Sequence, residues 1–387
     1  MALLAIIPLC GTENFEQQTK DRAMDKAKTF RPKTILLWQK VADDPEAQRI
    51  IELFPSADVR VIKKQANPPL PNMSPAQALL AGKRTLMIGA TSSFVGNFDG
   101  RLGSNVRCCP YYKLVPVSNG CPYYCTYCYL AFVYRKYSHF IKININYETM
   151  FRQIRKFLAN SHGKISFNMG EMLDSLALDH ITGLTKMLIP FFSGFSNGFL
   201  MLLTKSSNID NLLAVESSSN TVISWSLNAQ QIIRQYELGT ADLDERLKAA
   251  KQCQDRSYRI RVRIDPGILY PKWQDGYADL IQKTLTLIRP ENITLGMLRL
   301  LPDHFNLAAG AYGDRVRKLR DYKFVKGASD GKLRYQLKQR IEFYTLLIDT
   351  IRSFDKDVSI GLCRETPQIW NNLKDRCEPK KCNCIVW

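Results

Sequence analysis

Three cysteines stand close together in one short stretch of the chain. The stretch GCPYYCTYCYL, residues 120–130, contains Cys121, Cys125 and Cys128 in a C-x3-C-x2-C spacing. Structural zinc takes four ligands, usually from two C-x2-C pairs, and no second pair lies at the usual distance from this one. Three thiolates suit a cubane [4Fe–4S] cluster, although such clusters ordinarily have four cysteine ligands. The iron without a protein ligand would be free to bind a substrate or cofactor.

The sequence leaves other interpretations of its cysteines open. Zinc could bind these three thiols with a distant fourth cysteine, or the thiols could be buried without any metal. Four further cysteines lie near the end of the chain: Cys363, Cys377, Cys382 and Cys384. They could bind zinc or a second cluster, form a redox-active tail or simply pack, since their C-x-C spacing is poor for tetrahedral zinc.

The order of predicted elements places the three cysteines at one edge of a parallel sheet. From about residue 113, strand-like and helix-like runs alternate about six times, which predicts an α/β fold with a parallel sheet, either open or closed into a full or partial barrel. We favour a partial (β/α)6-type barrel. Functional residues gather at the carboxyl ends of such strands, and the cysteines directly follow the first one. The predicted strands cover residues 113–118, 164–169, 199–204, 221–227, 258–264, 292–298 and 357–362.

Three domains are predicted along the chain. Residues 1–105 are expected to form an N-terminal α/β module, with strands over 34–41 and 58–64 and a helix over 44–54 between them. Residues 106–365 are expected to form the partial barrel. Residues 366–387 are expected to form a cysteine-rich C-terminal tail.

Charge and composition limit the partners and the compartment. The chain has 54 Lys and Arg against 36 Asp and Glu, a formal net charge of +18, which favours a polyanionic partner such as nucleic acid, or else a merely solvated basic surface. Eleven cysteines, an odd and unevenly spaced set, argue against a secreted disulfide framework and predict a reducing cytoplasm. The apolar stretch 189–205 is interrupted by Ser, Asn and Gly, so no membrane span is expected.

The cysteine spacing, in the loop after the first strand of a strand–helix series, resembles that of radical S-adenosylmethionine enzymes. Other stretches are similar to one branch of that superfamily, the spore photoproduct lyase family of DNA-repair enzymes. These stretches are CTYCYL (125–130), DSLALDHITGL (174–184), LLTKSSNIDNLL (202–213), SWSLN (224–228), YELGTADLDERLKAAKQC (236–253), DGKLRY (330–335) and the N-terminal DDPEAQRIIELFPSADVRVI (43–62).

The resemblance implies an enzyme that reductively cleaves S-adenosylmethionine to a 5′-deoxyadenosyl radical, which abstracts hydrogen from a substrate, in this branch damaged DNA. It implies a [4Fe–4S] cluster and S-adenosylmethionine as cofactors, an electron donor such as flavodoxin or ferredoxin, and a monomer. Two alternatives remain. The same chemistry could act on a small molecule, RNA or protein, or the chain could be a non-catalytic metal-binding nucleic-acid module.

Carried over residue by residue, the resemblance assigns the cofactor site. Cys121, Cys125 and Cys128 would hold the cluster, and the aromatic Tyr127 would lie near the adenine. The remaining assigned residues stand at strand ends: Lys205, whose charge suits the carboxylate of S-adenosylmethionine, and Ser226 and Asn228, which suit its polar ribose and amino-acid atoms.

One position departs from the family pattern. Spore photoproduct lyases have a cysteine after the second strand that returns a hydrogen atom to the product radical, whereas the aligned residue here is Glu171. Gly170 and Glu171 instead resemble a superfamily element whose carboxylate binds the ammonium of S-adenosylmethionine. We therefore expect Glu171 to bind the cofactor, Asp174 to support the site, and thymine-dimer reversal to be inefficient. A thiol of the C-terminal tail could replace the missing donor.

Two tyrosines and a basic stretch complete the predicted site. Tyr129 and Tyr335 could relay a hydrogen atom or stack on a base, although such tyrosines also commonly pack in a core. Lys332 and Arg334 lie in the densest basic part of the chain and could contact phosphates, or could belong to a solvated surface.

Overall fold

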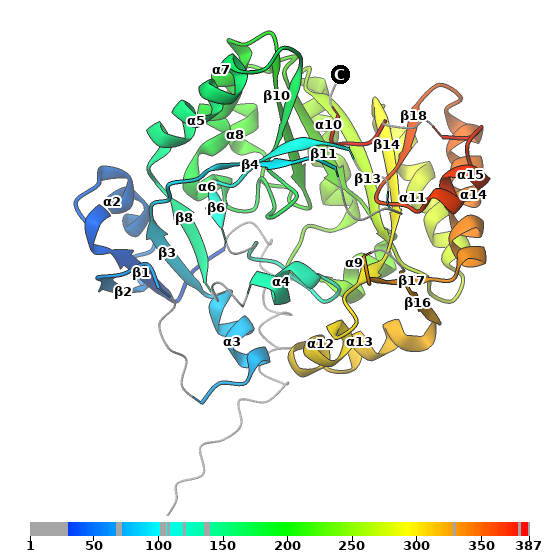
Figure 1. Cartoon of the computed structure of the whole chain (residues 1–387), viewed down its shortest axis with the longest axis horizontal. Helices are drawn as coiled ribbons and strands as arrows, with labels where there is room; N and C mark the ends of the chain where they lie inside the picture. Colours follow the sequence, from blue (N-terminus) through cyan, green and yellow to red (C-terminus); the bar gives the residue numbers. More distant parts are fainter. Residues whose placement is uncertain are drawn as a thin grey trace, which may run out of the picture.

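The computed structural model of the chain describes residues 30–66, 72–100, 106, 109–118, 121–134, 140–327, 330–377 and 381–385. A smaller N-terminal sheet lies at the left of Figure 1 and a larger, helix-covered sheet lies to its right. Among the described residues, no helix is long and apolar enough to cross a membrane.

The larger sheet consists of parallel strands with one antiparallel strand at its edge. Its strands pair in the order β18-β14-β13-β11-β10-β9-β5-β4, and within it only β4 and β5 are antiparallel. β11 is buried along its whole length, as expected for a parallel strand whose sheet is covered by helices. The order has two ends, so the barrel is partial, and the predicted α/β fold is confirmed. The bounds are β4 (Val95–Phe98), β5 (Tyr111–Leu114), β9 (Ile165–Asn168), β10 (Gly198–Thr204), β11 (Thr221–Ser226), β13 (Arg259–Gly267), β14 (Asn292–Met297) and β18 (Ser359–Leu362).

Helices connect these strands and cover the sheet (Figure 1). α10 shows why one begins where it does, because Asp242 and Glu245 form a reciprocal capping box at its first turn. The helices are α5 (Tyr147–Ala159), α6 (Asp179–Thr182), α7 (Leu184–Ser193), α8 (Asp210–Leu213), α9 (Gln230–Tyr236), α10 (Leu243–Asp255), α11 (Trp273–Leu287), α12 (His304–Tyr312), α13 (Asp314–Arg317), η2 (Lys318–Asp321), α14 (Leu337–Phe354) and α15 (Pro367–Asn372).

A three-stranded sheet lies in the connection between β14 and α14. It pairs β15 with β17 and β17 with β16, both antiparallel. The strands are β15 (Arg299–Leu300), β16 (Phe324–Lys326) and β17 (Leu333–Tyr335).

The smaller sheet combines the N-terminal segment with strands from beyond residue 105. Its order is β2-β1-β3-β8-β6, so two of its strands come from residues that the sequence analysis assigned to the barrel. The predicted strand over 113–118 is split at Pro116, whose carbonyl accepts a hydrogen bond from Asn144 N, 3.1 Å away. Residues before the proline join the larger sheet and those after it join the smaller one. The elements are β1 (Thr34–Trp38), η1 (Gln39–Val41), α2 (Pro45–Glu52), β2 (Asp58–Ile62), α3 (Pro75–Gly82), β3 (Thr85–Gly89), β6 (Val117–Ser118) and β8 (Ile141–Asn144).

Residues 381–385 pack against the strands of the larger sheet. Asn383 N donates to Thr294 Oγ1 at 3.0 Å, and Asn383 Nδ2 donates to Ser224 Oγ at 2.6 Å. The segment passes so close to Gly361 that a Cβ there would lie 1.8 Å from the carbonyl oxygen of Lys381. These contacts make the end of the described chain part of the barrel packing rather than an appendage.

Candidate active site

A cavity of about 280 Å³ opens at the carboxyl ends of the parallel strands. One wall is the loop that contains the three clustered cysteines. The others come mainly from the last residues of β10, β11 and β13 and from the residues that follow β9, β10, β14 and β18, as expected for a parallel α/β sheet.

Cys121, Cys125 and Cys128 all line this cavity. Two short elements shape their loop: β7 (Tyr124–Cys125) and α4 (Tyr129–Tyr134). β7 pairs antiparallel with β12 (Glu237–Leu238), so that Cys125 lies opposite Glu237. The sequence motif is therefore one half of a two-stranded ribbon whose other half comes from more than a hundred residues later.

Buried polar side chains hold the backbone of the cysteine loop. Lys83, at the end of α3, donates through Nζ to the carbonyl oxygens of Cys121, at 3.0 Å, and Tyr123. His304, at the start of α12, has its Nε2 3.0 Å from Thr126 O, and because a carbonyl only accepts, this nitrogen carries the proton. Burial lowers the pKa of His304 to about 4 although the Thr126 contact opposes it. Sequence analysis missed both anchors, since neither belongs to a recognisable motif.

The three thiols suit a metal cluster that replaces their protons. Burial raises the pKa of Cys121 to about 11 and that of Cys125 well above its ordinary value, and interactions among the three thiols add to this effect. Metal binding would deprotonate them. Among the described residues, no three His, Cys, Asp or Glu side chains are arranged to hold a single metal ion. A [4Fe–4S] cluster takes cysteine thiolates on its irons, and three cysteines that line one cavity can supply three of them.

A chain of charged and polar groups borders the cysteine loop. Lys205 follows β10 and bonds to Ser226 at the end of β11 through Nζ, and the same nitrogen lies 3.4 Å from Glu237 Oε1. Glu237 also accepts a hydrogen bond from the hydroxyl of Tyr127 and pairs with Arg246 at 2.6 Å. Tyr127, Lys205 and Ser226 all line the cavity, as their predicted role requires.

Glu237 is a site residue that sequence analysis did not identify. Its side chain is fully buried, and burial alone would raise its pKa. Lys205 and Arg246 outweigh burial and lower the pKa of Glu237 to about 2. The carboxylate is therefore charged at neutral pH and fixes Tyr127 beside the cluster cysteines. Glu237 lies in the stretch 236–253, which resembles the spore photoproduct lyase family, and this resemblance could have identified Glu237 as a site residue.

Asp174 holds two strand-end loops together. Its carboxylate accepts hydrogen bonds from the backbone nitrogens of Leu176, Ala177 and Lys205 and from the hydroxyl of Thr204, at 2.6–3.0 Å. It thus positions Lys205, while its role in supporting a bound cofactor stays a prediction. Nearby Gly170 must be a glycine, since a Cβ there would lie 2.3 Å from the Cβ of Leu203.

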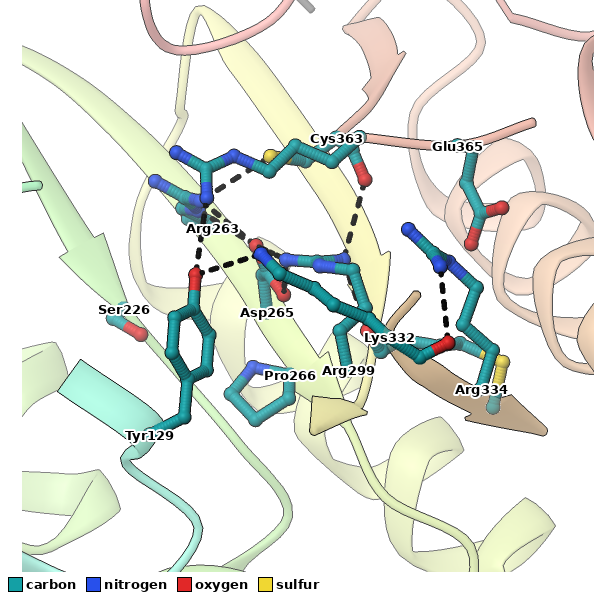
Figure 2. A network of polar contacts seen from close by, with 12 residues as sticks. Tyr129, Ser226, Arg263, Asp265, Pro266, Arg299, Lys332, Arg334, Cys363 and Glu365 are labelled. Carbon is teal, nitrogen blue, oxygen red and sulfur yellow. Dashed lines mark hydrogen bonds and ion pairs between the residues drawn. The ribbon is translucent and has the colours of Figure 1, made fainter. Parts of the chain in front are cut away.

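The wall formed by β13, β14 and β18 is rich in arginine (Figure 2). Asp265 lies 2.8 Å from both Arg263 and Arg299. Glu171 pairs with Arg263 at 2.5 Å and with Arg364 at 3.2 Å. Burial would raise the pKa of Glu171, but the two arginines lower it. Glu171 lines the cavity, yet both its oxygens already have guanidinium partners. Cofactor binding by Glu171 stays a prediction, and this geometry does not favour it.

Tyr129 joins the cysteine wall to the arginine wall. Its hydroxyl accepts hydrogen bonds from Lys332 Nζ at 3.1 Å and from Arg364 Nη1 at 3.3 Å. The Lys332 ammonium also lies 4.5 Å from the centroid of the Tyr129 ring, a cation–π contact. Figure 2 shows the tyrosine hydroxyl pointing toward Lys332.

Three predicted residues lie away from the cavity. Asn228 is buried behind β11, where Nδ2 donates to Pro266 O and Oδ1 accepts from Tyr277. Tyr335 is buried in an aromatic core, and its hydroxyl accepts from Leu269 N at 3.3 Å. Arg334 pairs with Asp330 at 2.6 Å. None of the three lines the cavity, so the geometry does not favour their predicted roles in cofactor binding, catalysis or phosphate contact.

The C-terminal cysteines have different neighbours, although Cys382 and Cys384 also contact one another. Cys363 Sγ lies 3.2 Å from Arg263 Nη2, and Cys384 Sγ lies 4.0 Å from Glu171 Oε1. Cys382 instead contacts Cys109, with 3.0 Å between the sulfurs, and Cys377 donates to Leu373 O. Two tail thiols thus stand behind the arginine wall, but neither is among the residues that line the cavity.

Comparison with known proteins gives consistent results. A sequence model described as "Spore photoproduct lyase" matches residues 30–309. The chain is 25% identical over 254 residues to spore photoproduct lyase of Clostridium acetobutylicum, covering 64% of this chain and 72% of the relative. It is 26% identical over 261 residues to the enzyme of a Geobacillus species, covering 66% of this chain and 74% of the relative.

Solved structures show the same fold. A point mutant of spore photoproduct lyase superposes with a TM-score of 0.74 at 21% identity, covering 87% of this chain and 99% of that chain. A double mutant "with bound AdoMet and dinucleoside spore photoproduct" has a TM-score of 0.73 at 21% identity and the same coverage.

Proposed function

Because the chain belongs to the spore photoproduct lyase family, it is a radical S-adenosylmethionine enzyme of that type, and we propose that it acts on a lesion in DNA. The observation that carries the proposal is the single cavity with three thiols on one wall and paired arginines on another. The first wall suits an electron-transferring cluster. The second suits an anionic substrate.

The cysteine wall would hold the cofactors. Cys121, Cys125 and Cys128 would bind the [4Fe–4S] cluster, whose bound S-adenosylmethionine supplies, on reduction, a 5′-deoxyadenosyl radical. Lys205, kept in place by the Asp174 loop and by Glu237, would bind the carboxylate of the cofactor, and Ser226 would bind its polar atoms. Tyr127 would lie against the adenine.

The arginine wall would bind the substrate. Its cavity-lining residues include three cations, Arg263, Arg299 and Arg364, against the two carboxylates of Glu171 and Asp265. A fourth cation, Lys332, contacts Tyr129, which lines the cavity and whose ring could stack on a base. Damaged DNA offers a binding partner to each: a phosphodiester for the cations and a flat base for the Tyr129 ring. One relative was solved with a dinucleoside spore photoproduct, a lesion of this class.

Return of a hydrogen atom to the substrate cannot use Glu171, which stands where the family has its donor cysteine. A carboxylate held by two guanidiniums has no hydrogen atom to donate. Of the cavity-lining tyrosines, Tyr127 donates its hydroxyl to Glu237, whereas the Tyr129 hydroxyl accepts from Lys332 and Arg364, and we assign the relay to Tyr129. Since a phenol is a different donor from a thiol, we expect repair of spore photoproduct itself to be slow and to release by-products.

The test compares damaged with undamaged DNA under anaerobic conditions. The cluster-loaded protein receives S-adenosylmethionine, dithionite and short duplexes with or without a site-specific spore photoproduct. We expect the lesion to accelerate 5′-deoxyadenosine release at least tenfold, with an affinity for DNA that falls steeply with salt. Tyr129→Phe should increase by-products, whereas Tyr322→Phe, outside the cavity, should not. Cleavage insensitive to any DNA but stimulated by another substrate class would overturn the proposal.

A further inference from the structure

Three buried thiols form a group that the proposed function does not use. Cys109 comes shortly before β5, and Cys382 and Cys384 belong to the segment 381–385. Cys382 Sγ lies 3.0 Å from Cys109 Sγ, although 273 residues separate the two in the chain. Cys382 also forms a hydrogen bond with Cys384. Two distant parts of the chain therefore meet in one set of sulfurs, which we call the thiol group.

The segment 381–385 bridges the two ends of the strand order in the larger sheet. That order runs from β18 to β4, with β5 beside β4. At one end, the carbonyl oxygen of Lys381 lies against Gly361 of β18. At the other end, Cys382 contacts Cys109, two residues before the start of β5. A bond between Cys109 and Cys382 would therefore join the two sides of the partial barrel.

A small apolar cluster encloses the thiol group. Tyr111 of β5 packs with the three cysteines, and Ile385 packs against them. The contact with Cys109 raises the pKa of Cys382 well above its ordinary value, and the contact with Cys382 does the same for the pKa of Cys384. Cys382 and Cys384 are therefore neutral thiols at neutral pH.

The thiol group also adjoins the arginine wall. Cys384 Sγ lies 4.0 Å from Glu171 Oε1, and Glu171 lines the cavity. Arg261 of β13 donates through Nη1 to Cys382 O at 3.4 Å, which holds the segment 381–385 on the sheet. A covalent bond that fixes this segment would therefore also fix one neighbour of the arginine wall.

Zinc is the other common partner of clustered thiols, and the geometry argues against it. Thiolates that share a zinc ion at about 2.3 Å lie about 3.8 Å apart. Cys109 and Cys382 are closer than this, with 3.0 Å between their sulfurs. In the part of the chain that the structure describes, no three His, Cys, Asp or Glu side chains are set around a single metal position. A disulfide requires the two sulfurs to approach by only about 1 Å more.

We propose that Cys109 and Cys382 are a reversible oxidation site, at which exchange with a low-molecular-weight disulfide forms a bond that closes the partial barrel. The observation that carries the proposal is the direct contact of two sulfurs from the two sides of the barrel. Cys384 remains a thiol beside Glu171. The proposal does not depend on a DNA substrate, because neither Cys109 nor Cys382 lines the cavity.

The exchange balances with glutathione disulfide as the only oxidant. The thiolate of one cysteine attacks the glutathione disulfide, which releases one glutathione and leaves a mixed disulfide. The second cysteine then attacks the protein sulfur and releases the second glutathione. Two S–H bonds are broken and one S–S bond forms, while two electrons and two protons pass to the two glutathione molecules. Since Cys382 is buried and protonated, we expect the exchange to be slow, so its equilibrium is the quantity to measure.

The experiment equilibrates the cluster-loaded, full-length protein with reduced and oxidised glutathione under anaerobic conditions. After an acid quench, the remaining thiols are alkylated in denaturant, and the linked peptides are identified by mass spectrometry. Cys108 adjoins Cys109, and Cys384 lies close to Cys382, so the variants Cys109→Ser and Cys384→Ser identify the linked positions. Cys253→Ser, which changes a buried thiol of α10, is the matched control. Iron and zinc are measured in every sample.

We expect a linkage between Cys109 and Cys382 that grows with the oxidised fraction of glutathione and disappears with dithiothreitol. It should exceed every other cysteine pair about tenfold or more, because direct contact of the sulfurs favours this pair. The linkage should persist in Cys384→Ser and Cys253→Ser and be absent from Cys109→Ser.

Oxidation should also raise the urea midpoint of unfolding in the wild type but not in Cys109→Ser, because the bond closes a long loop and restricts the unfolded chain. Three results would overturn the proposal. These are no linkage at the most oxidising ratio, a linkage of the segment 381–385 that survives in Cys109→Ser, and one zinc ion per chain that thiol alkylation releases.

Discussion

The two walls of the cavity are built in different ways. The cysteine wall comes from eight consecutive residues, includes Cys121 and Cys125, whose pKa burial raises, and is held through its backbone by Lys83, His304 and β12. The arginine wall comes from the ends of several strands far apart in the sequence and is held by its own ion pairs. The cysteine wall is a local sequence motif held by residues that are distant in the chain. The arginine wall forms only when distant strands come together in the folded protein.

This difference predicts unequal responses to mutation. The cysteine wall should lose its function completely when one thiol is removed, because the thiols act together on one cluster. The arginine wall should lose stability by degrees, because each carboxylate has two partners.

The largest effect is expected for Cys125→Ala. Two remaining thiolates cannot hold a site-differentiated cubane, so the variant should lose the brown chromophore and all cleavage of S-adenosylmethionine. The control is Cys253→Ala, which removes a buried thiol of α10 that lies elsewhere in the core. Iron content and absorbance after anaerobic reconstitution check both variants. Full iron and activity in Cys125→Ala would show that the motif does not bind the cluster.

Much of the cysteine wall could be predicted from the sequence, and little of the arginine wall. The spacing of Cys121, Cys125 and Cys128 lies within one loop, and strand–helix alternation placed that loop at the correct sheet edge. Arg364 and Arg263 come together only through β18 and β13, and such pairing leaves no local pattern.

The predicted site residues that lie away from the cavity, and the features that the sequence did not reveal, also depend on contacts between distant parts of the chain. Asn228 and Tyr335 sit at the expected chain positions, but whether a strand-end side chain faces the cavity or the core depends on packing that spacing does not determine. Glu237 was missed because its partner strand is the cysteine loop itself. Pro116 split a predicted strand because its two halves pair with different sheets.

The next largest effect is expected for Glu237→Gln, which tests how far the cysteine wall depends on its distant support. Removing this buried charge leaves Arg246 without its carboxylate, which should lower the free energy of unfolding by about 3–5 kcal/mol. Asp255→Asn, which breaks an exposed pair with Lys251, should cost less than about 0.5 kcal/mol. Urea denaturation measures both, and equal losses would contradict the buried role of Glu237.

A smaller loss is expected for Glu171→Gln, in the arginine wall. Two guanidiniums would lose a charged acceptor, which should lower the free energy of unfolding by about 1.5–3 kcal/mol. Because both oxygens are already engaged, we expect the affinity for S-adenosylmethionine to change less than about threefold, or about 0.7 kcal/mol. A tenfold or larger weakening, measured by calorimetry on the cluster-loaded protein, would instead assign Glu171 to the cofactor.

The smallest effect concerns pH and His304. The folded chain holds the pKa of His304 at about 4, below its ordinary 6.5, so the unfolded chain takes up a proton first as the pH falls. Stability should therefore decrease between pH 7 and 5, with about 2 kcal/mol of the loss due to this residue. His304→Gln keeps an N–H donor for Thr126 but does not titrate. If the variant lost as much stability over this range as the wild type, His304 would not be a neutral anchor of the cysteine wall.

The most direct test of the central claim is isotope tracing between substrate and cofactor. A short duplex with a deuterated spore photoproduct is incubated anaerobically with cluster-loaded protein, S-adenosylmethionine and reductant, and 5′-deoxyadenosine is analysed by mass spectrometry. The proposed function predicts deuterium in the 5′-deoxyadenosine, even if repair to thymine is slow. Rapid formation of 5′-deoxyadenosine with no deuterium, from this lesion and from other damaged DNA alike, would contradict a DNA lesion as the substrate.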